Sequence, residues 1–165
     1  LSFCRGVRGR AEVVPTDTDY TVIIDYAHTP DALANILAAV CAIADSRVLV
    51  VFGCGGDRDK TKRAEMGHIA AGLADEVILT SDNPRTENPY AILHDILEGM
   101  AGSSTPFAVL EDRRGAIAYA LGRARTGDVV LLAGKGHETY QERGTEKLPF
   151  DERQVVHEYL KRGDQ

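Results

Sequence analysis

The sequence has few cysteines and no long apolar segment. Its 165 residues include three cysteines, Cys4, Cys41 and Cys54, too scattered for a disulfide framework and without the spacing of metal ligands. Each is expected to be a free thiol in a reducing compartment. No apolar run approaches the roughly 18 residues of a membrane span, and no basic-then-apolar signal segment opens the chain. These absences predict a cytoplasmic protein.

An excess of basic residues is also lacking. The chain carries 19 Lys+Arg against 25 Asp+Glu, a formal net charge of −6. This balance argues against binding to nucleic acid or to a membrane surface, because both favour a basic partner. It still permits small anionic ligands, since a few local arginines outweigh the global charge. The length, with 44% hydrophobic and 27% charged residues, predicts a single domain over residues 1–165. The chain begins with Leu1 rather than methionine, so we expect it to be a piece of a longer protein.

Short apolar, β-branched runs alternate with segments of helical periodicity. Strands are expected at residues 21–25, 47–52, 76–80, 107–111 and 128–133, with an extra edge strand within 6–14. Helices are expected around 33–43, 66–73, 92–100, 113–125 and 151–160, and a loop over 143–149. The runs are continuous rather than alternating, as in parallel strands covered on both faces. The pattern predicts an α/β fold: a Rossmann-like, doubly wound, mostly parallel sheet of about six strands with helices on both faces.

Unusual polar and glycine-rich segments follow four of the expected strands. They read Asp25-Tyr-Ala-His-Thr-Pro30, Gly53-Cys-Gly-Gly-Asp-Arg-Asp-Lys60, Ser81-Asp-Asn-Pro-Arg-Thr-Glu-Asn-Pro89 and Gly134-Lys-Gly-His-Glu138. The connections at the opposite edge, such as 44–46 and 74–75, are short and plain. Because ligands of open parallel sheets bind beyond the carboxyl ends of the strands, this asymmetry predicts a ligand-binding rim.

The glycine-rich segment 53–56 favours an anion. Its glycines can present backbone N–H groups, and a helix starting near Lys60 would add its N-terminal dipole. It is not a Walker loop, because Asp59 stands where a glycine should precede Lys60. Arg58 beside it favours a carboxylate or phosphate ligand. A tight strand-to-helix turn would equally account for the glycines.

The other rim segments offer groups for both charges. Asn83 can donate and accept, and Arg85 presents a fork for a carboxylate. Pro84 and Pro89 stiffen the backbone on either side of Arg85. A solvated Arg85, with Asp82 and Asn83 capping turns, explains the same residues. Glu138 suits an ammonium group.

The remaining rim residues have simpler alternatives. Gly134 allows close approach of the backbone, and Lys135 is either an anion contact or solvated. Asp25, at a strand end, is suited to ribose hydroxyls. His28 and His137 lack a third metal ligand, so no metal site is predicted.

Five segments together resemble one family. The chain resembles the C-terminal domain of a Mur ligase, because five segments occur in family order: Gly6-Val-Arg-Gly-Arg10, Asp25-Tyr-Ala-His-Thr-Pro30, Gly53-Cys-Gly-Gly-Asp-Arg-Asp-Lys60, Asp82-Asn-Pro-Arg85 and Gly134-Lys-Gly-His-Glu138. The resemblance implies ATP-dependent amide formation in peptidoglycan precursor synthesis through an acyl phosphate. ATP and Mg²⁺ would be held mainly by a central domain, and UDP-N-acetylmuramoyl-L-alanyl-D-glutamate by parts that this chain lacks. The fragment alone is expected to be inactive.

The resemblance also implies roles for single residues. Arg58 would hold the carboxylate beside the reacting amine of meso-diaminopimelate. The far end of that amino acid would meet the quartet Asp82, Asn83, Pro84 and Arg85 (carboxylate) and the pair Gly134 and Glu138 (ammonium). The nucleotide would meet Arg10, Asp25, Tyr26 and His28. L-Lysine lacks the far carboxylate, and a site that demands a polar partner discriminates by roughly 10⁴-fold or more.

Three other functions are compatible with parts of the sequence. A folylpolyglutamate synthetase-like ligase fits less well, because glutamate offers no second ammonium for Glu138. A stand-alone amino-acid-binding or regulatory module would keep the same rim without the ATPase. An NAD-dependent Rossmann enzyme is weaker, since the first strand-to-helix turn lacks the required glycines.

Overall fold

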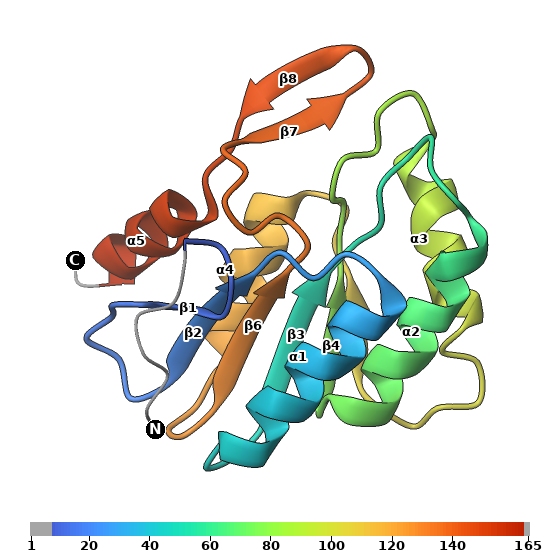
Figure 1. Cartoon of the computed structure of the whole chain (residues 1–165). Helices are drawn as coiled ribbons and strands as arrows, with labels where there is room; N and C mark the ends of the chain where they lie inside the picture. The colour runs from blue at the N-terminus through green and yellow to red at the C-terminus, as the bar shows by residue number, and fades with distance from the viewer. Residues whose placement is uncertain (1–7, 164–165) are drawn as a thin grey trace.

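A six-stranded sheet forms the centre of the molecule (Figure 1). The computed structural model describes residues 8–163, so Cys4 and the first two residues of the segment 6–10 lie outside the described part. The strands are β1 (Glu12–Val14), β2 (Thr21–Asp25), β3 (Val48–Phe52), β4 (Glu76–Leu79), β5 (Phe107–Val109), β6 (Val129–Ala133), β7 (Tyr140–Arg143) and β8 (Glu146–Pro149). The helices are α1 (Pro30–Ile43), α2 (Thr61–Leu73), α3 (Pro89–Glu98), α4 (Arg113–Arg123) and α5 (Glu152–Gly163).

The order of the strands brings the rim segments together. The sheet runs β1-β2-β6-β3-β4-β5, and all neighbours are parallel except the edge strand β1, which is antiparallel to β2. Asp25 pairs with Ala133 at the ends of β2 and β6, and Phe52 pairs with Leu79 at the ends of β3 and β4. The segments that follow these four strands consequently leave the sheet side by side.

Two hydrophobic cores cover the two faces of the sheet. Along β3, Val50 and Phe52 pack with α1, α2 and α3, whereas Leu49 and Val51 pack with α4 and α5. Successive side chains of a strand point to opposite faces, so a strand that is apolar throughout requires helices on both sides. The predicted doubly wound fold is confirmed, and the five parallel strands end within two residues of the expected positions. The expected edge strand within 6–14 is confirmed for Glu12–Val14.

The expected loop over 143–149 is wrong, because these residues belong to a β-hairpin. Strands β7 and β8 pair antiparallel, with Arg143 opposite Glu146, and the hairpin extends beyond the carboxyl ends of the parallel strands (Figure 1). Gly144 takes a φ of 60° in the turn, a backbone conformation that favours glycine. All four residues of β8 are exposed, so no buried face marks this strand in the sequence.

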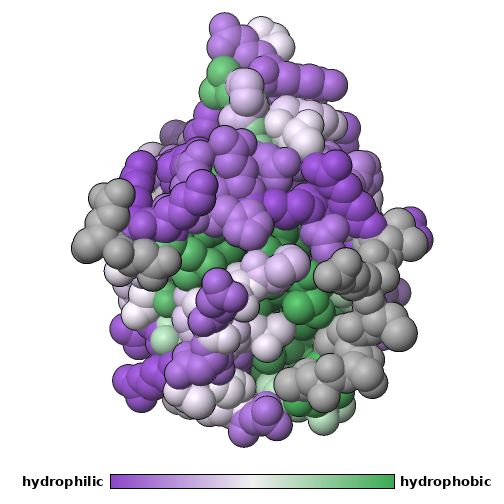
Figure 2. All heavy atoms as spheres, turned by 90° about the vertical axis from the view of Figure 1, so that its left-hand side faces the viewer, coloured by the Kyte–Doolittle hydropathy of each residue, from purple (hydrophilic) through white to green (hydrophobic). Residues whose placement is uncertain are grey.

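The surface around this hairpin is mainly hydrophilic. Figure 2 shows hydrophilic side chains over the top of the molecule and its upper rim, with apolar side chains gathered below them.

Below the rim, β1 and α5 border a shallow cavity lined in part by Val13, Val14 and Pro15. Among residues 8–163, no helix combines the length and apolar character that crossing a membrane requires.

Candidate ligand-binding site

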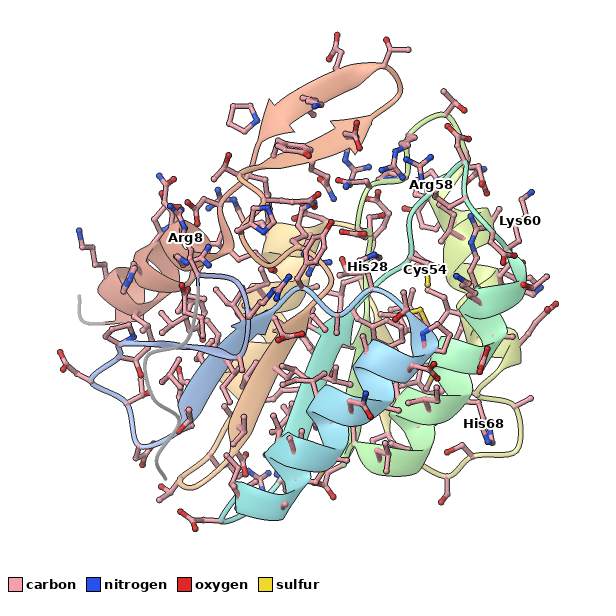
Figure 3. All side chains as sticks on the ribbon, in the orientation of Figure 1. Arg8, His28, Cys54, Arg58, Lys60 and His68 are labelled. Carbon is pink, nitrogen blue, oxygen red and sulfur yellow. The ribbon has the colours of Figure 1, made fainter. Side chains whose placement is uncertain are left out.

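A cavity of about 370 Å³ lies where the four rim segments converge. It is lined by Tyr26, His28, Thr29, Gly53, Cys54, Gly55, Arg58, Asp59, Lys62, Arg63, Met66, Asp82, Asn83, Arg85, Gly134 and Glu138. Most predicted site residues are among them, whereas Arg10, Asp25 and Pro84 are not. Figure 3 shows His28, Cys54 and Arg58 at this edge of the sheet, while His68 lies on the remote part of α2.

The segment after β2 is held by the carboxylate of Asp25. Its Oδ1 accepts a hydrogen bond from the N–H of Ala11 (2.7 Å), and Oδ2 accepts one from the N–H of Ala27 (2.8 Å). Both oxygens thus fix backbone next to the cavity. Thr29 caps α1 by accepting from the N–H of Ala32 (3.2 Å), so the helix begins at Pro30, three residues before the expected start.

The turn that contains Arg10 lies against the segment after β6. Gly9 has a φ of 81°, and a Cβ at this position would lie 2.3 Å from the backbone nitrogen of His137. Only glycine permits this approach. The ring of Tyr26 lies 4.6 Å from that of His28 and 5.3 Å from that of His137, between centroids. The predicted nucleotide residues are therefore near one another, with Arg10 exposed.

The glycine-rich segment packs against the segment after β4. The N–H of Gly56 donates to the carbonyl of Asn83 (2.8 Å), and a Cβ on Gly56 would lie 1.8 Å from the carbonyl oxygen of Pro84. The expectation that the N–H of Gly56 faces an anion is wrong, because the carbonyl of Asn83 in the neighbouring loop accepts its hydrogen bond. Arg58 is exposed at the cavity, where its Nη1 donates to the carbonyl of Asp57 (3.0 Å).

Arg63 also lines the cavity, although it lies on α2, outside the segments predicted to form the site. Its side chain is 1% exposed and makes a two-pronged ion pair with Glu87, through Nη1 (3.0 Å) and Nη2 (2.9 Å). Nη1 also contacts Asp95 (3.0 Å), and Nη2 donates to the carbonyl of Gly55 (3.0 Å). The hydrogen bonds from Arg63 lower the pKa of the Glu87 carboxyl to about 2. In the sequence, this arginine looks like any charged residue on a helix surface.

Lys135 is buried, so its interpretation as a solvated residue is wrong. Its Nζ donates to Oδ1 of Asn83 (2.8 Å) and lies 3.5 Å from Asp82 and 3.4 Å from Glu138. One ammonium thus faces two carboxylates, which leaves this end of the cavity negative overall. An isolated buried lysine would be costly, and these partners compensate its charge.

The contacts of Asn83 and Arg85 orient both side chains. Oδ1 of Asn83 accepts from Lys135 and from the N–H of Glu142 (2.9 Å), which turns its Nδ2 toward Glu138 at the cavity. Nη1 of Arg85 donates to the carbonyl of Gly56 (2.9 Å). Both residues therefore present donors where a ligand carboxylate could bind.

A buried ion pair supports the rim from the other face of the sheet. Nε of Arg113 donates to Glu152 (3.0 Å), and both side chains are fully buried. The remaining nitrogens of Arg113 donate to the carbonyls of Ser81 (3.1 Å) and Ala133 (3.0 Å) at the ends of β4 and β6. This pair ties α4 and α5 to two of the four strand ends.

The described residues do not provide a metal centre. No group of three or more His, Cys, Asp or Glu side chains within 8–163 is placed to hold a metal ion. Cys41 and Cys54 are free thiols, and burial raises the pKa of Cys54 to about 12. The chemistry that this cavity can perform is recognition of a small molecule through arginine, amide and carboxylate groups.

These features define a Rossmann-like α/β domain with a cavity of mixed charge beyond the carboxyl edge of its sheet. The chain belongs to the Mur ligase family, because residues 9–136 match the family described as Mur ligase, glutamate ligase domain. This membership confirms the resemblance that the five sequence segments indicate.

Individual relatives agree with the family assignment. A UDP-N-acetylmuramoyl-L-alanyl-D-glutamate–2,6-diaminopimelate ligase of Caldanaerobacter subterraneus subsp. tengcongensis is 54% identical over 154 residues, 93% of this chain and 32% of that protein. A solved structure of a ligase of the same name has a TM-score of 0.91 at 41% identity, over 97% of this chain and 33% of that one. The chain spans about a third of the length of these relatives.

The fold is shared more widely. A bifunctional folylpolyglutamate synthase/dihydrofolate synthase from Yersinia pestis CO92 has a TM-score of 0.61 at 25% identity, over 80% of this chain and 29% of that one. The difference between 41% and 25% identity favours the diaminopimelate ligases as the nearer group.

Proposed function

We propose that this chain is the amino-acid-binding domain of a longer ATP-dependent ligase. The ligase would add meso-diaminopimelate to UDP-N-acetylmuramoyl-L-alanyl-D-glutamate in the synthesis of peptidoglycan precursors. The names of the relatives support this substrate pair. The two free thiols support a reducing, cytoplasmic setting.

One observation carries the proposal: the cavity collects complementary charges for an amino acid with carboxylates at both ends. Arg58 follows the glycine-rich segment, and Asn83, Arg85 and Glu138 come from the segments after β4 and β6. In the proposed pose, Arg58 binds the carboxylate next to the reacting amine. Asn83 Nδ2 and Arg85 bind the far carboxylate, and Glu138 with the carbonyl of Gly134 binds the far ammonium.

The residues of this chain would contribute positioning rather than covalent chemistry. Binding both ends of the amino acid leaves its reacting amine directed toward the acyl phosphate formed elsewhere in the ligase, and fixed geometry of this kind lowers the barrier to attack. Attack forms the amide bond and expels phosphate. Closure of the domain over the intermediate would exclude water from a group that is prone to hydrolysis.

The proposed nucleotide contacts come from the turn at residue 10 and from the segment after β2. Arg10 is exposed, and Tyr26 and His28 line the cavity. Asp25 would act on the nucleotide mainly by fixing the backbone of Ala11 and Ala27, because both of its oxygens accept bonds from those residues. ATP would supply the phosphoryl group with Mg²⁺, both held mainly outside this chain.

Arg85→Ala tests the proposal in the complete ligase. We expect kcat/KM for meso-diaminopimelate to fall by about 100-fold or more, because truncation removes a charged partner from a largely desolvated site. Arg114→Ala, on the exposed surface of α4, is the matched control and should leave the kinetics unchanged. Steady-state phosphate release measures both variants. Unchanged use of diaminopimelate by the Arg85 variant would refute the assignment.

A further inference from the structure

Hydrogen bonds from strand β7 hold the loop that carries Asn83 and Arg85. Besides the bond from the N–H of Glu142 to Asn83, Nε2 of Gln141 donates to the carbonyl of Asp82 (2.8 Å). The N–H of Arg85 donates to the carbonyl of Glu142 (3.0 Å), and the carbonyl of Arg85 accepts from Gly144 (2.7 Å). Arg85 thus lies beside β7 as a parallel bridge partner, with a φ of 52°. Its backbone is fixed by main-chain contacts alone.

The side chain of Glu142 adds a charge to this arrangement. Its Oε2 lies 2.9 Å from Nη2 of Arg85, and the two side chains are 26% and 20% exposed, respectively. Arg85 is also held through Nη1 by the carbonyl of Gly56. Because backbone and Nη1 contacts already place Arg85, the Glu142 carboxylate is not needed to position it. What it contributes is a negative charge on a guanidinium that lines the cavity.

We propose that Glu142 is a specificity-determining residue of the amino-acid site. The inference rests on the proposed function, in which Arg85 binds the far carboxylate of the amino acid. That carboxylate must share Arg85 with Glu142, and the negative charge of Glu142 repels it. Glu142 therefore weakens the binding of an amino acid that has a far carboxylate. It also keeps Arg85 paired when the amino acid lacks one, and so lowers the penalty for L-lysine.

Neighbouring charges do not replace Glu142 in this role. Arg143, the next residue of β7, pairs with Glu111 on the other side of the strand. Glu138 contacts Lys135, which also lies near Asp82. Among the described residues, Glu142 is the carboxylate paired with Arg85.

The test is Glu142→Gln in the complete ligase. Glutamine keeps the backbone contacts of β7 and the shape of the side chain while removing its charge. For a partly exposed ion pair we expect KM for meso-diaminopimelate to fall by about threefold to tenfold, with kcat unchanged. L-Lysine, measured as a competitive inhibitor, should bind more weakly than to the wild type, because Arg85 is then left unpaired. The site should thus bind diaminopimelate more tightly and L-lysine more weakly, and a purely structural role of Glu142 would not produce opposite changes.

Glu146→Gln is the matched control, since it makes the same change at an exposed position of β8. It should leave both constants unchanged. Glu142→Thr, a β-forming uncharged alternative, should reproduce the effects of glutamine. An unchanged or higher KM for diaminopimelate in both Glu142 variants overturns the inference. Failure of the wild-type ligase to convert diaminopimelate would instead refute the proposed function, so the two failures are distinguishable.

Discussion

Replacing Arg63 with methionine tests whether this buried side chain holds the cavity wall together. Methionine preserves helix propensity and much of the apolar stem, so the substitution removes mainly the guanidinium. The variant loses the ion pair with Glu87, the contact with Asp95 and the bond to the carbonyl of Gly55. These contacts join α2, α3 and two rim loops.

The expected loss follows from the exposure of the partners. Removing one member of a buried ion pair costs about 3–5 kcal/mol when the other stays desolvated. Glu87 is 16% exposed and Asp95 is 35% exposed, so both regain some water when Arg63 is gone. We therefore expect the free energy of unfolding to fall by about 2–3 kcal/mol. For a domain of this size the melting temperature should fall by roughly 5–10 °C.

The pH dependence provides a sharper readout. In the folded wild type, Arg63 holds the pKa of Glu87 at about 2, below its ordinary value of 4.5. A lowered pKa stabilises the folded state above the unfolded value, and this stabilisation is lost as the pH falls toward 2. The difference in stability between wild type and Arg63→Met should therefore be largest near neutral pH and should shrink below pH 4.5.

Thermal and urea unfolding of the chain, followed by circular dichroism at neutral and acid pH, measures both effects. Lys62→Met is the matched control, because Lys62 precedes Arg63 on α2 and is exposed. It should change the melting temperature little at either pH. Equal destabilisation by the two substitutions, or a loss at Arg63 that does not depend on pH, would show that the ion pair with Glu87 does not stabilise the fold.

Two further predictions concern loop packing and thiol reactivity. Gly56→Ala should destabilise the chain by about 1–3 kcal/mol in urea unfolding, the range for overpacking, because its Cβ would overlap the carbonyl of Pro84. Gly72→Ala, whose Cβ meets nothing within 4 Å on α2, should stabilise it by about 0.5–1 kcal/mol, and the opposite ranking would contradict the packing argument. Alkylation at pH 8, mapped by peptide mass spectrometry, should modify the half-buried Cys41 well before Cys54, because burial raises the pKa of Cys54 to about 12. Equal rates in the folded chain would show that Cys54 is accessible.

The arrangement of the strands is largely predictable from the chain itself. A run such as residues 48–52 is apolar at every position, so it must be covered on both faces, and parallel strands joined by helices satisfy that requirement. Such a sheet has a single carboxyl edge, which places the segments after residues 25, 52, 79 and 133 together. The position of the cavity follows from local pattern and topology alone.

The hairpin and the burial of each charged side chain, in contrast, are not predictable from the sequence. Nothing in the exposed sequence of β8 distinguishes a strand from a loop, because its partner contacts are backbone hydrogen bonds that any residues can make. Lys135 and Lys62 are the same residue type, yet one is fully buried and the other is exposed.

The segments that form the rim of this domain can be recognised in the amino-acid sequence, but the pairing of their charged side chains depends on the tertiary fold. Arg85 meets Glu142, Arg63 meets Glu87, and each pair joins segments far apart in the chain. The energy of a charge depends on its solvation and on the nearest opposite charge, and both are set only when distant loops pack together. Local sequence carries no signal for either.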